Sequence, residues 1–256
     1  MNDLEKEYQN PTYLKEKNMF FFLLNPKTHL ISDKENYIIG PKIKEYPVWI
    51  WSKDRLTVEK KEEIKLLLEE KYLKKGENPF ICKKELYEEI TQSFSTMDYF
   101  EMGYLQCESL KECKEVSGVF AKANYGDKIA LAKLWQSFCK EVDQEEIELK
   151  ECLEVVSDLL ERDQFYVWRN NQGKVISMAS YSVEQDVAAI SHVYTKKEER
   201  NKGYCANLIY YLTKNLLEKN LHPMLYTDYH YKPSNASYKK VGYQEKGILI
   251  RFKICI

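Results

Sequence analysis

The chain has 256 residues, and 31% of them are charged, but 39 Lys and Arg against 40 Asp and Glu leave a net charge of −1. A balance this even gives no overall field that would attract nucleic acid or an acidic membrane, so the sequence predicts neither as a partner. The length suffices for one large domain or two small ones, and we expect two.

The seven cysteines lie far apart, and no C-x-x-C pair predicts a zinc or redox site. Scattered cysteines in an odd number are typical of reduced thiols in the cytosol. Residues 1–17 are charged where a signal peptide would be apolar, and no apolar run approaches the length of a membrane span. We therefore expect a soluble, cytoplasmic protein that binds no metal.

The first half mixes aromatic-rich segments with Lys/Glu-rich segments. Aromatic and β-branched runs that are bounded by Pro, Gly or Asn predict strands. A 3.6-residue apolar period that stops at Gly76 predicts a helix over residues 58–75. The predicted strands cover residues 18–25, 36–40, 45–52 and 98–107, a second helix covers residues 83–94, and a connector or short helix covers residues 108–118. We place the domain boundary at residues 113/114.

The second half has a more regular order. Asp127 predicts the N-cap of a helix in which Leu131, Leu134, Trp135 and Phe138 form one apolar stripe. The other predicted elements are helices over residues 144–161 and 203–219, strands over residues 165–169, 175–184, 186–195, 224–228 and 247–254, and a helical turn over residues 235–241. Two helices, three antiparallel strands, a helix and two more strands indicate an α+β fold with one mixed sheet.

One segment of the second half is typical of an anion-binding turn. A strand that ends at residues 193–195 leads through R-x-x-G-x-C, residues 200–205, into an amphipathic helix. A helix N-terminus offers unpaired N–H groups and the positive end of the helix dipole, and a glycine there lets a phosphate approach. Taken alone, the turn is equally well explained as a strand-to-helix connection that is capped by glycine.

A second motif, N-x-x-Y-x-x-x-G-Y at residues 235–243, follows the next predicted strand. In this order, the two motifs with their strands and helix resemble the GNAT superfamily of N-acetyltransferases over about residues 120–254. The resemblance implies a GNAT-like domain over residues 114–256, with a mixed, mostly antiparallel sheet flanked by helices. A smaller α/β domain over residues 1–113 would precede it, and its mixture of strands and helices permits a degenerate copy of the same fold.

The resemblance implies an enzyme that transfers an acetyl group from acetyl-CoA to a primary amine, by direct attack in a ternary complex. The cofactor arm would pair with the strand end, the pyrophosphate would lie on the amides of the turn, and Tyr238 would protonate the departing CoA thiolate. The implied cofactor-binding residues are Val193, Tyr194, Thr195, Arg200, Asn201, Lys202, Gly203, Tyr204, Cys205, Ala206, Asn235 and Tyr238.

The sequence departs from the family pattern at two places. Cys205 stands where the family usually has Gly or Ala, which enlarges this position modestly and does not suggest a nucleophile. Many relatives carry a Glu or His base on the strand before the turn, but Ala189 and Ser191 stand on that face here, and period-two alternation turns His192 to the opposite side. Water, an already neutral amine or a carboxylate such as Asp228 would then replace the base.

The missing base leaves an alternative open, which is a catalytically inactive acyl-CoA-binding or regulatory module. An interaction protein without a cofactor would require both motifs to be accidental, and it ranks last. The acceptor stays open among polyamines, antibiotics, amino acids, peptide N-termini and protein lysines, because variable loops build the acceptor cleft in this superfamily. The sequence carries no signal of the oligomeric state.

Overall fold

The computed structural model describes residues 11–24, 29–43, 46–143 and 146–256, and the chain divides into two compact units. The division differs from a single cut at residues 113/114, because segments near the C-terminus belong to the first unit. Unit 1 consists of Met1–Tyr104, Thr227–Tyr231 and Glu245–Ile256, and unit 2 consists of Leu105–Tyr226 and Lys232–Gln244.

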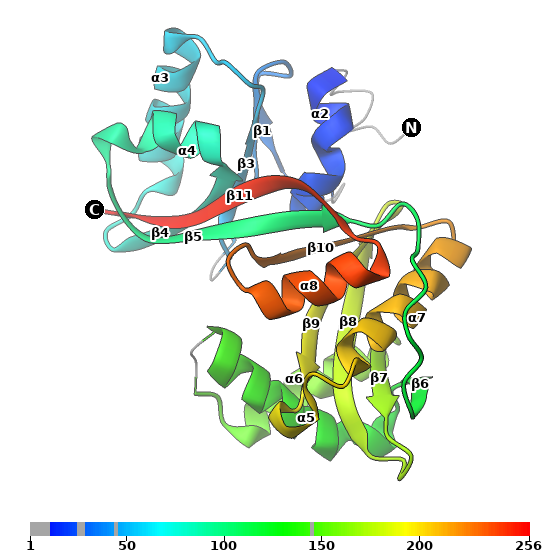
Figure 1. Ribbon diagram of the computed structural model, residues 1–256. Coiled ribbons are helices and arrows are strands. Elements are labelled where there is room, and N and C mark those ends of the chain that lie inside the picture. The colour runs from blue at the N-terminus through cyan, green and yellow to red at the C-terminus, as the bar shows by residue number, and fades with distance from the viewer. Residues whose placement is uncertain (1–10, 25–28, 44–45, 144–145) are drawn as a thin grey trace. The chain divides into compact units, whose positions relative to one another are not determined.

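Unit 2 has a mixed sheet in the order β10-β9-β8-β7-β6, in which the β9–β10 pair is parallel and the other pairs are antiparallel (Figure 1). Its strands are β6 (Val119–Lys122), β7 (Phe165–Arg169), β8 (Val175–Glu184), β9 (Val187–Thr195) and β10 (His222–Asp228), the end of which belongs to unit 1. Its helices are α5 (Lys128–Phe138), α6 (Leu149–Glu161), α7 (Tyr204–Glu218) and α8 (Lys232–Val241).

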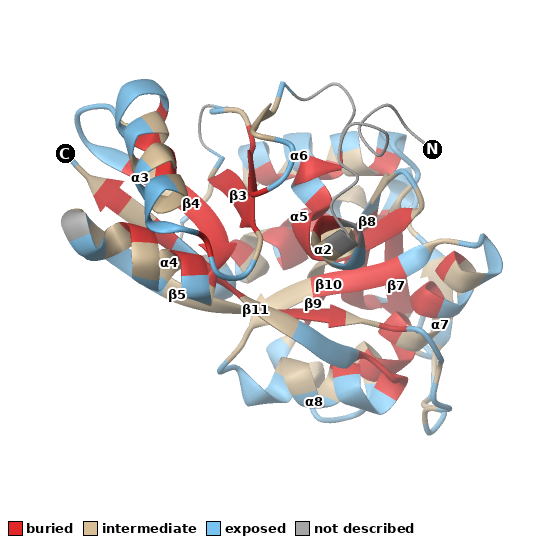
Figure 2. Cartoon of the chain, turned by 90° about the horizontal axis from the view of Figure 1, so that it is seen from above, coloured by how far each residue is buried: buried red, intermediate tan, exposed pale blue. Residues whose placement is uncertain are grey.

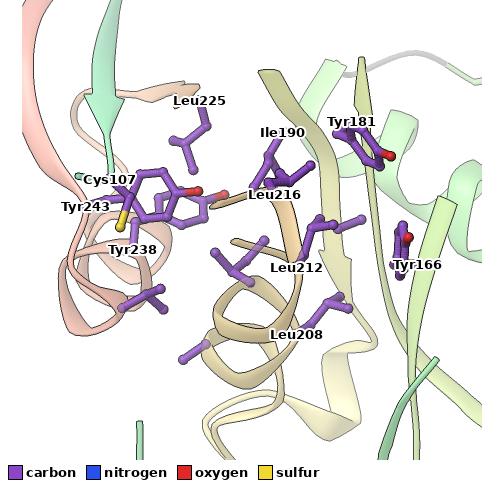
Figure 3. Packing of buried hydrophobic residues seen from close by; sticks show 14 of the residues in the cluster. Cys107, Tyr166, Tyr181, Ile190, Leu208, Leu212, Leu216, Leu225, Tyr238 and Tyr243 are labelled. Atoms are coloured by element: carbon purple, nitrogen blue, oxygen red, sulfur yellow. The ribbon is translucent and has the colours of Figure 1, made fainter. Parts of the chain in front are cut away.

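Helices cover both faces of this sheet, so unit 2 has two hydrophobic cores. On one face, α5 and α6 pack on β7, β8 and β9 around Leu131, Val156 and Met178. On the other face, α7 presents Leu208, Leu212 and Leu216, which are spaced four residues apart and therefore share one side of the helix. Figure 3 shows these leucines between Tyr166 and Tyr181 of the sheet and a group formed by Cys107, Tyr238 and Tyr243.

Unit 1 also has a mixed sheet, in the order β1-β2-β3-β4-β11-β5. The strands are β1 (Ile31–Ser32), β2 (Tyr37–Ile39), β3 (Val48–Ser52), β4 (Glu77–Lys83), β5 (Ser95–Gln106) and β11 (Gln244–Cys255). The helical segments are α2 (Pro11–Glu16), η1 (Lys17–Leu23), α3 (Val58–Leu67), η2 (Leu68–Tyr72), α4 (Lys84–Ile90) and η3 (Thr91–Ser93). β3 and β4 are buried along most of their length (Figure 2).

The two units repeat one order of elements. In unit 1, the antiparallel strands β1, β2 and β3 are followed by α3, by β4 parallel to β3, and by α4. In unit 2, the antiparallel strands β7, β8 and β9 are followed by α7, by β10 parallel to β9, and by α8. This repetition supports the expectation that unit 1 is a degenerate copy of the fold, which stays a prediction.

Several predicted elements differ from those observed. The aromatic run over residues 18–25, predicted as a strand, lies largely in the 3₁₀ helix η1, where Phe20, Phe21 and Leu23 are buried. A short apolar run without alternation fits a buried helical turn as well as a strand, which explains the error. The sequence did not predict β4 or β6, and the helix predicted over residues 58–75 ends at Tyr72 in a π-helical turn. Residues 25, 45 and 144–145 of the predicted elements lie outside the described residues.

Candidate functional site

Two neighbouring parallel strands of unit 2 part before β9 ends. β9 and β10 pair from Val187 opposite His222 to Ile190 opposite Leu225. β9 continues to Thr195 while its other edge pairs with β8. Within the described residues, the last part of β9 therefore has no β10 partner, and an extended ligand with amide groups can add to this edge as a strand would.

The chain leaves β9 through a turn that ends at the N-terminus of α7. Gly203, the N-cap of α7, has φ 88° and ψ −1°, and Asn201 has φ 62°. Glycine adopts this left-handed conformation without steric cost, and Asn tolerates it better than most residues. The first helical residues, Tyr204, Cys205 and Ala206, direct their N–H groups out of the helix end, and the first turn holds no acidic side chain. The turn therefore presents oriented donors at the positive end of a helix dipole.

Carboxylates of the same unit hold two cations of this turn. Lys202 Nζ lies 2.8 Å from a carboxylate oxygen of Glu199. Arg200 donates from Nε to the Thr195 carbonyl oxygen at 3.0 Å and from a terminal nitrogen to Glu141 at 2.7 Å. Arg200 thus fastens the turn to the end of β9, and the backbone amides of the turn are donors that can face an anion.

Glu141 is a further candidate residue of the site, and no sequence motif points to it. It lies in η5 (Cys139–Asp143), a π-helical turn that follows α5. Its carboxylate accepts hydrogen bonds from Arg200 and from the Tyr194 hydroxyl, and the Arg200 guanidinium lies 5.1 Å from the Tyr194 ring centroid. Burial alone would raise the pKa of Glu141, but these hydrogen bonds hold it below its usual value. Glu141 is therefore ionised at neutral pH, and it joins the end of α5 to the end of β9.

The side chains of the three predicted residues at the end of β9 are used within the fold. Val193 packs half-buried against the core under α7, and Tyr194 is buried in the core under α5. Thr195 Oγ1 lies 2.7 Å from Ser177 Oγ. A contact between these residues and a bound cofactor would therefore be made chiefly by their backbone groups.

Tyr238 lies on α8 and is only 6% exposed. Its ring centroid is 6.2 Å from that of Tyr243, whose hydroxyl lies 2.8 Å from Thr213 Oγ1 (Figure 3). No described residue forms a hydrogen bond with the Tyr238 hydroxyl. Burial, with a smaller contribution from the nearby Cys205, holds the pKa of Tyr238 well above its ordinary value. The phenol is therefore protonated at neutral pH and can act as a proton donor.

The remaining predicted residues gather around the same helix end. Ala206 is buried, and Tyr204 and Cys205 pack half-buried on the core under α7. Burial, partly offset by a hydrogen bond with Ser237 of α8, raises the pKa of Cys205 to about 11. A thiol with such a pKa is a poor nucleophile, in agreement with the expected minor role of Cys205. Asn235 is half-buried on α8, one turn before Tyr238.

The structure corrects the prediction for His192. Ser180 lies opposite Ser191, and Met178 lies opposite Tyr194, so a β-bulge interrupts the alternation between these pairs. His192 lies in the bulge with φ 52°, and its Nδ1 is 2.7 Å from Ser180 Oγ and 3.1 Å from Ser191 Oγ. The imidazole therefore shares the face of Ser191, contrary to the period-two argument.

The surroundings of His192 keep its imidazole neutral. Its ring lies 4.4 Å from that of Trp135 and 5.8 Å from that of Phe138, both on α5. Burial lowers the pKa of His192 to about 4. A neutral imidazole that is held beside the parted edge of β9 can accept a proton there.

Asp228, the carboxylate that the sequence offers in place of the missing base, belongs to a turn of unit 1 together with His230. Asp228 Oδ1 accepts a hydrogen bond from the His230 backbone N–H at 2.8 Å, which is typical of a residue that organises a turn. His230 Nε2 lies 3.0 Å from a carboxylate oxygen of Glu101. These contacts indicate that Asp228 organises the turn.

Besides the parted strands, the glycine-capped helix and the buried tyrosine, the sequence itself matches a known protein family. The sequence model of the acetyltransferase (GNAT) family matches residues 84–243, which is more than half of the chain. The chain belongs to this family. No curated protein matches the GNAT chain.

Solved GNAT structures resemble the chain over nearly its whole length. A GNAT-family acetyltransferase from Colwellia psychrerythraea has a TM-score of 0.60 at 11% identity, over 94% of this chain and 96% of that one. A GCN5-related N-acetyltransferase from Kribbella flavida has a TM-score of 0.60 at 11% identity, over 96% of both chains. A GCN5-related N-acetyltransferase from Sphaerobacter thermophilus has a TM-score of 0.59 at 7% identity, over 85% and 76%. At these identities the likeness confirms the expected α+β fold alone.

None of the described helices combines the length and the apolar character that crossing a bilayer requires. Among the same residues, no three His, Cys, Asp or Glu side chains are grouped so that they could hold a metal ion.

Proposed function

We propose that this GNAT chain transfers an acetyl group from acetyl-CoA to a primary amine, which attacks the thioester directly in a ternary complex. The observation that carries the proposal is the parting of β9 from β10 directly before the glycine-capped N-terminus of α7. One edge of β9 then suits the amides of a pantetheine arm, and the helix end suits a pyrophosphate. No other described helix N-terminus follows a parted pair of parallel strands and is capped by a left-handed glycine.

The residues proposed for cofactor binding differ in what they contribute. The backbone of Val193, Tyr194 and Thr195 supplies the strand edge, and the amides of residues 201–206 surround the pyrophosphate. Arg200 and Lys202 act through their place in the turn, because their side chains are held by Glu141 and Glu199. Asn235 and Tyr238 approach from α8, which contacts α7.

The reaction needs no covalent intermediate with the protein, because a thioester is already activated toward attack by an amine. The protein has to hold the amine against the thioester carbonyl and to supply and remove protons. The amine nitrogen forms a bond to the carbonyl carbon, the carbon–sulfur bond breaks, and Tyr238 gives its proton to the thiolate. The high pKa of Tyr238 supports this role, because it keeps the phenol protonated until the thiolate forms.

We assign the removal of a proton from the amine to His192. In the tautomer in which Nδ1 donates its proton to Ser180 Oγ, Nε2 is free to accept one. The low pKa of His192 makes it a weak base, but it also means that the imidazole is unprotonated at neutral pH. An amine that reaches the site already neutral needs no stronger base.

Isothermal titration with acetyl-CoA, followed by a transfer assay on a panel of amines, tests this proposal. We expect micromolar binding by the wild type, loss of binding in Gly203→Glu, and in Tyr238→Phe a turnover at least tenfold lower with binding unchanged. Gly203→Glu places a carboxylate where the pyrophosphate would lie. Absence of binding by the wild type would refute the cofactor, and binding without transfer to any amine would indicate the inactive acyl-CoA-binding module instead.

A further inference from the structure

The segment between β5 and β6, residues 108–118, is described without a helix or a strand, yet it is tied to both helices of the proposed cofactor site. We call this segment the strap. At its first half, Lys111 N–H donates to the Val241 carbonyl oxygen at the end of α8 at 2.8 Å. The Cys113 thiol lies 4.0 Å from the Lys240 carbonyl oxygen. The strap is therefore fixed to the helix that carries Tyr238.

The second half of the strap is tied to the N-terminus of α7 by one buried amide. Asn207 is 3% exposed, and its Nδ2 donates to the Lys114 carbonyl oxygen at 3.0 Å and to the Gly203 carbonyl oxygen at 3.1 Å. Both protons of this amide are thus used, one on the strap and one on the N-cap of α7. Asn207 connects the strap to the residue at which the phosphate turn ends.

Both glycines of the two sequence motifs lie against the strap. A Cβ atom on Gly203 would lie 2.9 Å from Val116 Cγ1, and one on Gly242 would lie 2.4 Å from the Ser109 carbonyl oxygen. Carbon atoms in proteins pack best at about 3.5–4.0 Å, so a side chain at position 203 would displace the Val116 side chain, and one at position 242 would displace the strap backbone. The closeness of the strap is a reason for glycine at both places, in addition to their positive φ angles of 88° and 115°.

We propose that the strap is part of the cofactor site and that Asn207 is a positioning residue for acetyl-CoA. In a trans peptide group, the carbonyl of one residue and the N–H of the next point in opposite directions. The Gly203 carbonyl accepts hydrogen bonds from the backbone N–H of Asn207 at 3.1 Å and from its side-chain amide at 3.1 Å. The side-chain bond adds to the backbone bond, so the Asn207 side chain restrains the direction of the Tyr204 N–H, which is among the donors proposed for the pyrophosphate. The strap extends this restraint to α8, so the phosphate donors and the Tyr238 acid are held by one segment.

The inference rests on the proposed function for its ligand, but not for the restraint itself, and the variant Asn207→Leu tests the two separately. Leu has nearly the shape of Asn and donates no hydrogen bond. Thr213→Val is the matched control, because it also removes a buried hydrogen bond from α7, here the one to Tyr243, and it leaves the strap untouched. Loss of buried hydrogen bonds destabilises the folded chain, so both variants should melt at a lower temperature, and Asn207→Leu should melt lower than Thr213→Val because it loses two such bonds.

Two readouts separate a positioning role from a merely structural one. We expect Asn207→Leu to raise the Kd and KM for acetyl-CoA about tenfold with kcat within twofold of the wild type, while Thr213→Val leaves the KM unchanged. Without any ligand, we expect amide hydrogen exchange of residues 201–206 to be faster in Asn207→Leu only. Unchanged exchange there, or an equal rise of the Kd in both variants, would overturn the role of Asn207. Absence of acetyl-CoA binding by the wild type would instead overturn the proposed function.

Discussion

Because Gly203 lies close to Val116, the stability cost of a side chain at position 203 can be measured and assigned to its causes. Replacing Gly203 by Ala has two costs that come from the protein alone. An L-residue at φ 88° costs about 1–2 kcal/mol relative to glycine. A Cβ atom 2.9 Å from Val116 Cγ1 adds overpacking, which typically costs about 1–3 kcal/mol. We therefore expect Gly203→Ala to lower the free energy of unfolding by about 2–5 kcal/mol in sum.

A double-mutant cycle separates these two costs. Val116 is half-buried, so Val116→Ala alone should destabilise the protein by about 1 kcal/mol through lost burial. In the double variant, the shortened side chain makes room for the new methyl group, and the overpacking cost disappears while the backbone cost remains. The double variant should therefore be more stable than the sum of the single effects by at least about 1 kcal/mol.

Urea unfolding of the four proteins, together with titration with acetyl-CoA, measures the cycle. If the strap causes the strain, the double variant regains stability and also regains part of the acetyl-CoA affinity that Gly203→Ala has lost. Additive effects on unfolding, within about 0.3 kcal/mol, would refute the reasoning about the strap. The requirement for glycine would then come from its φ angle and from the ligand.

Two further variants address the other parts of the site. Glu141→Gln should weaken acetyl-CoA binding by about three- to tenfold, because Arg200 loses the partner that holds it in the turn; an equal weakening in Glu146→Gln, an exposed carboxylate beside Lys140, would contradict this role of Glu141. Because burial lowers the pKa of His192 from 6.5 to about 4, the unfolded chain binds a proton between these pH values that the folded chain does not, so stability should fall as the pH falls through this window. From pH 7 to pH 5, the urea midpoint of unfolding should therefore fall by more in the wild type than in His192→Gln. An equal fall in both proteins would contradict the burial of a neutral His192.

The parts of the fold that repeat a local pattern were predictable from the sequence. The leucines of α7 recur at helical spacing, and the strands β7 to β9 are rich in β-branched and aromatic residues, so their places follow from local preference. β4 escaped prediction because Pro79 interrupts the segment, although the strand pairs on both edges. Such a segment becomes a strand because it pairs with strands far away in the sequence. A prediction from neighbouring residues alone cannot include these partners.

In the candidate site, too, some residues were predictable from local motifs and others were not. The turn at Gly203 and the tyrosine at position 238 follow from spaced motifs. His192 was misplaced because a bulge changes the face of every later side chain, and nothing in the residues around it announces one. Glu141 and Asn207 act through partners 59 and 93 residues away in the sequence, so only the folded chain brings their contacts together.

The return of β11 to unit 1 has a consequence for the order in which the protein can fold during synthesis. β11 pairs with β4 from Leu249 opposite Lys83 to Cys255 opposite Glu77, and residues 84–243 are made between the two strands. Although unit 1 contains all of the first 104 residues, its sheet cannot be completed until β11 has left the ribosome. Until then, an edge of β4 is exposed as an unpaired strand that other chains can join. A fragment that ends after β5 would carry the same open edge, so we expect it to aggregate.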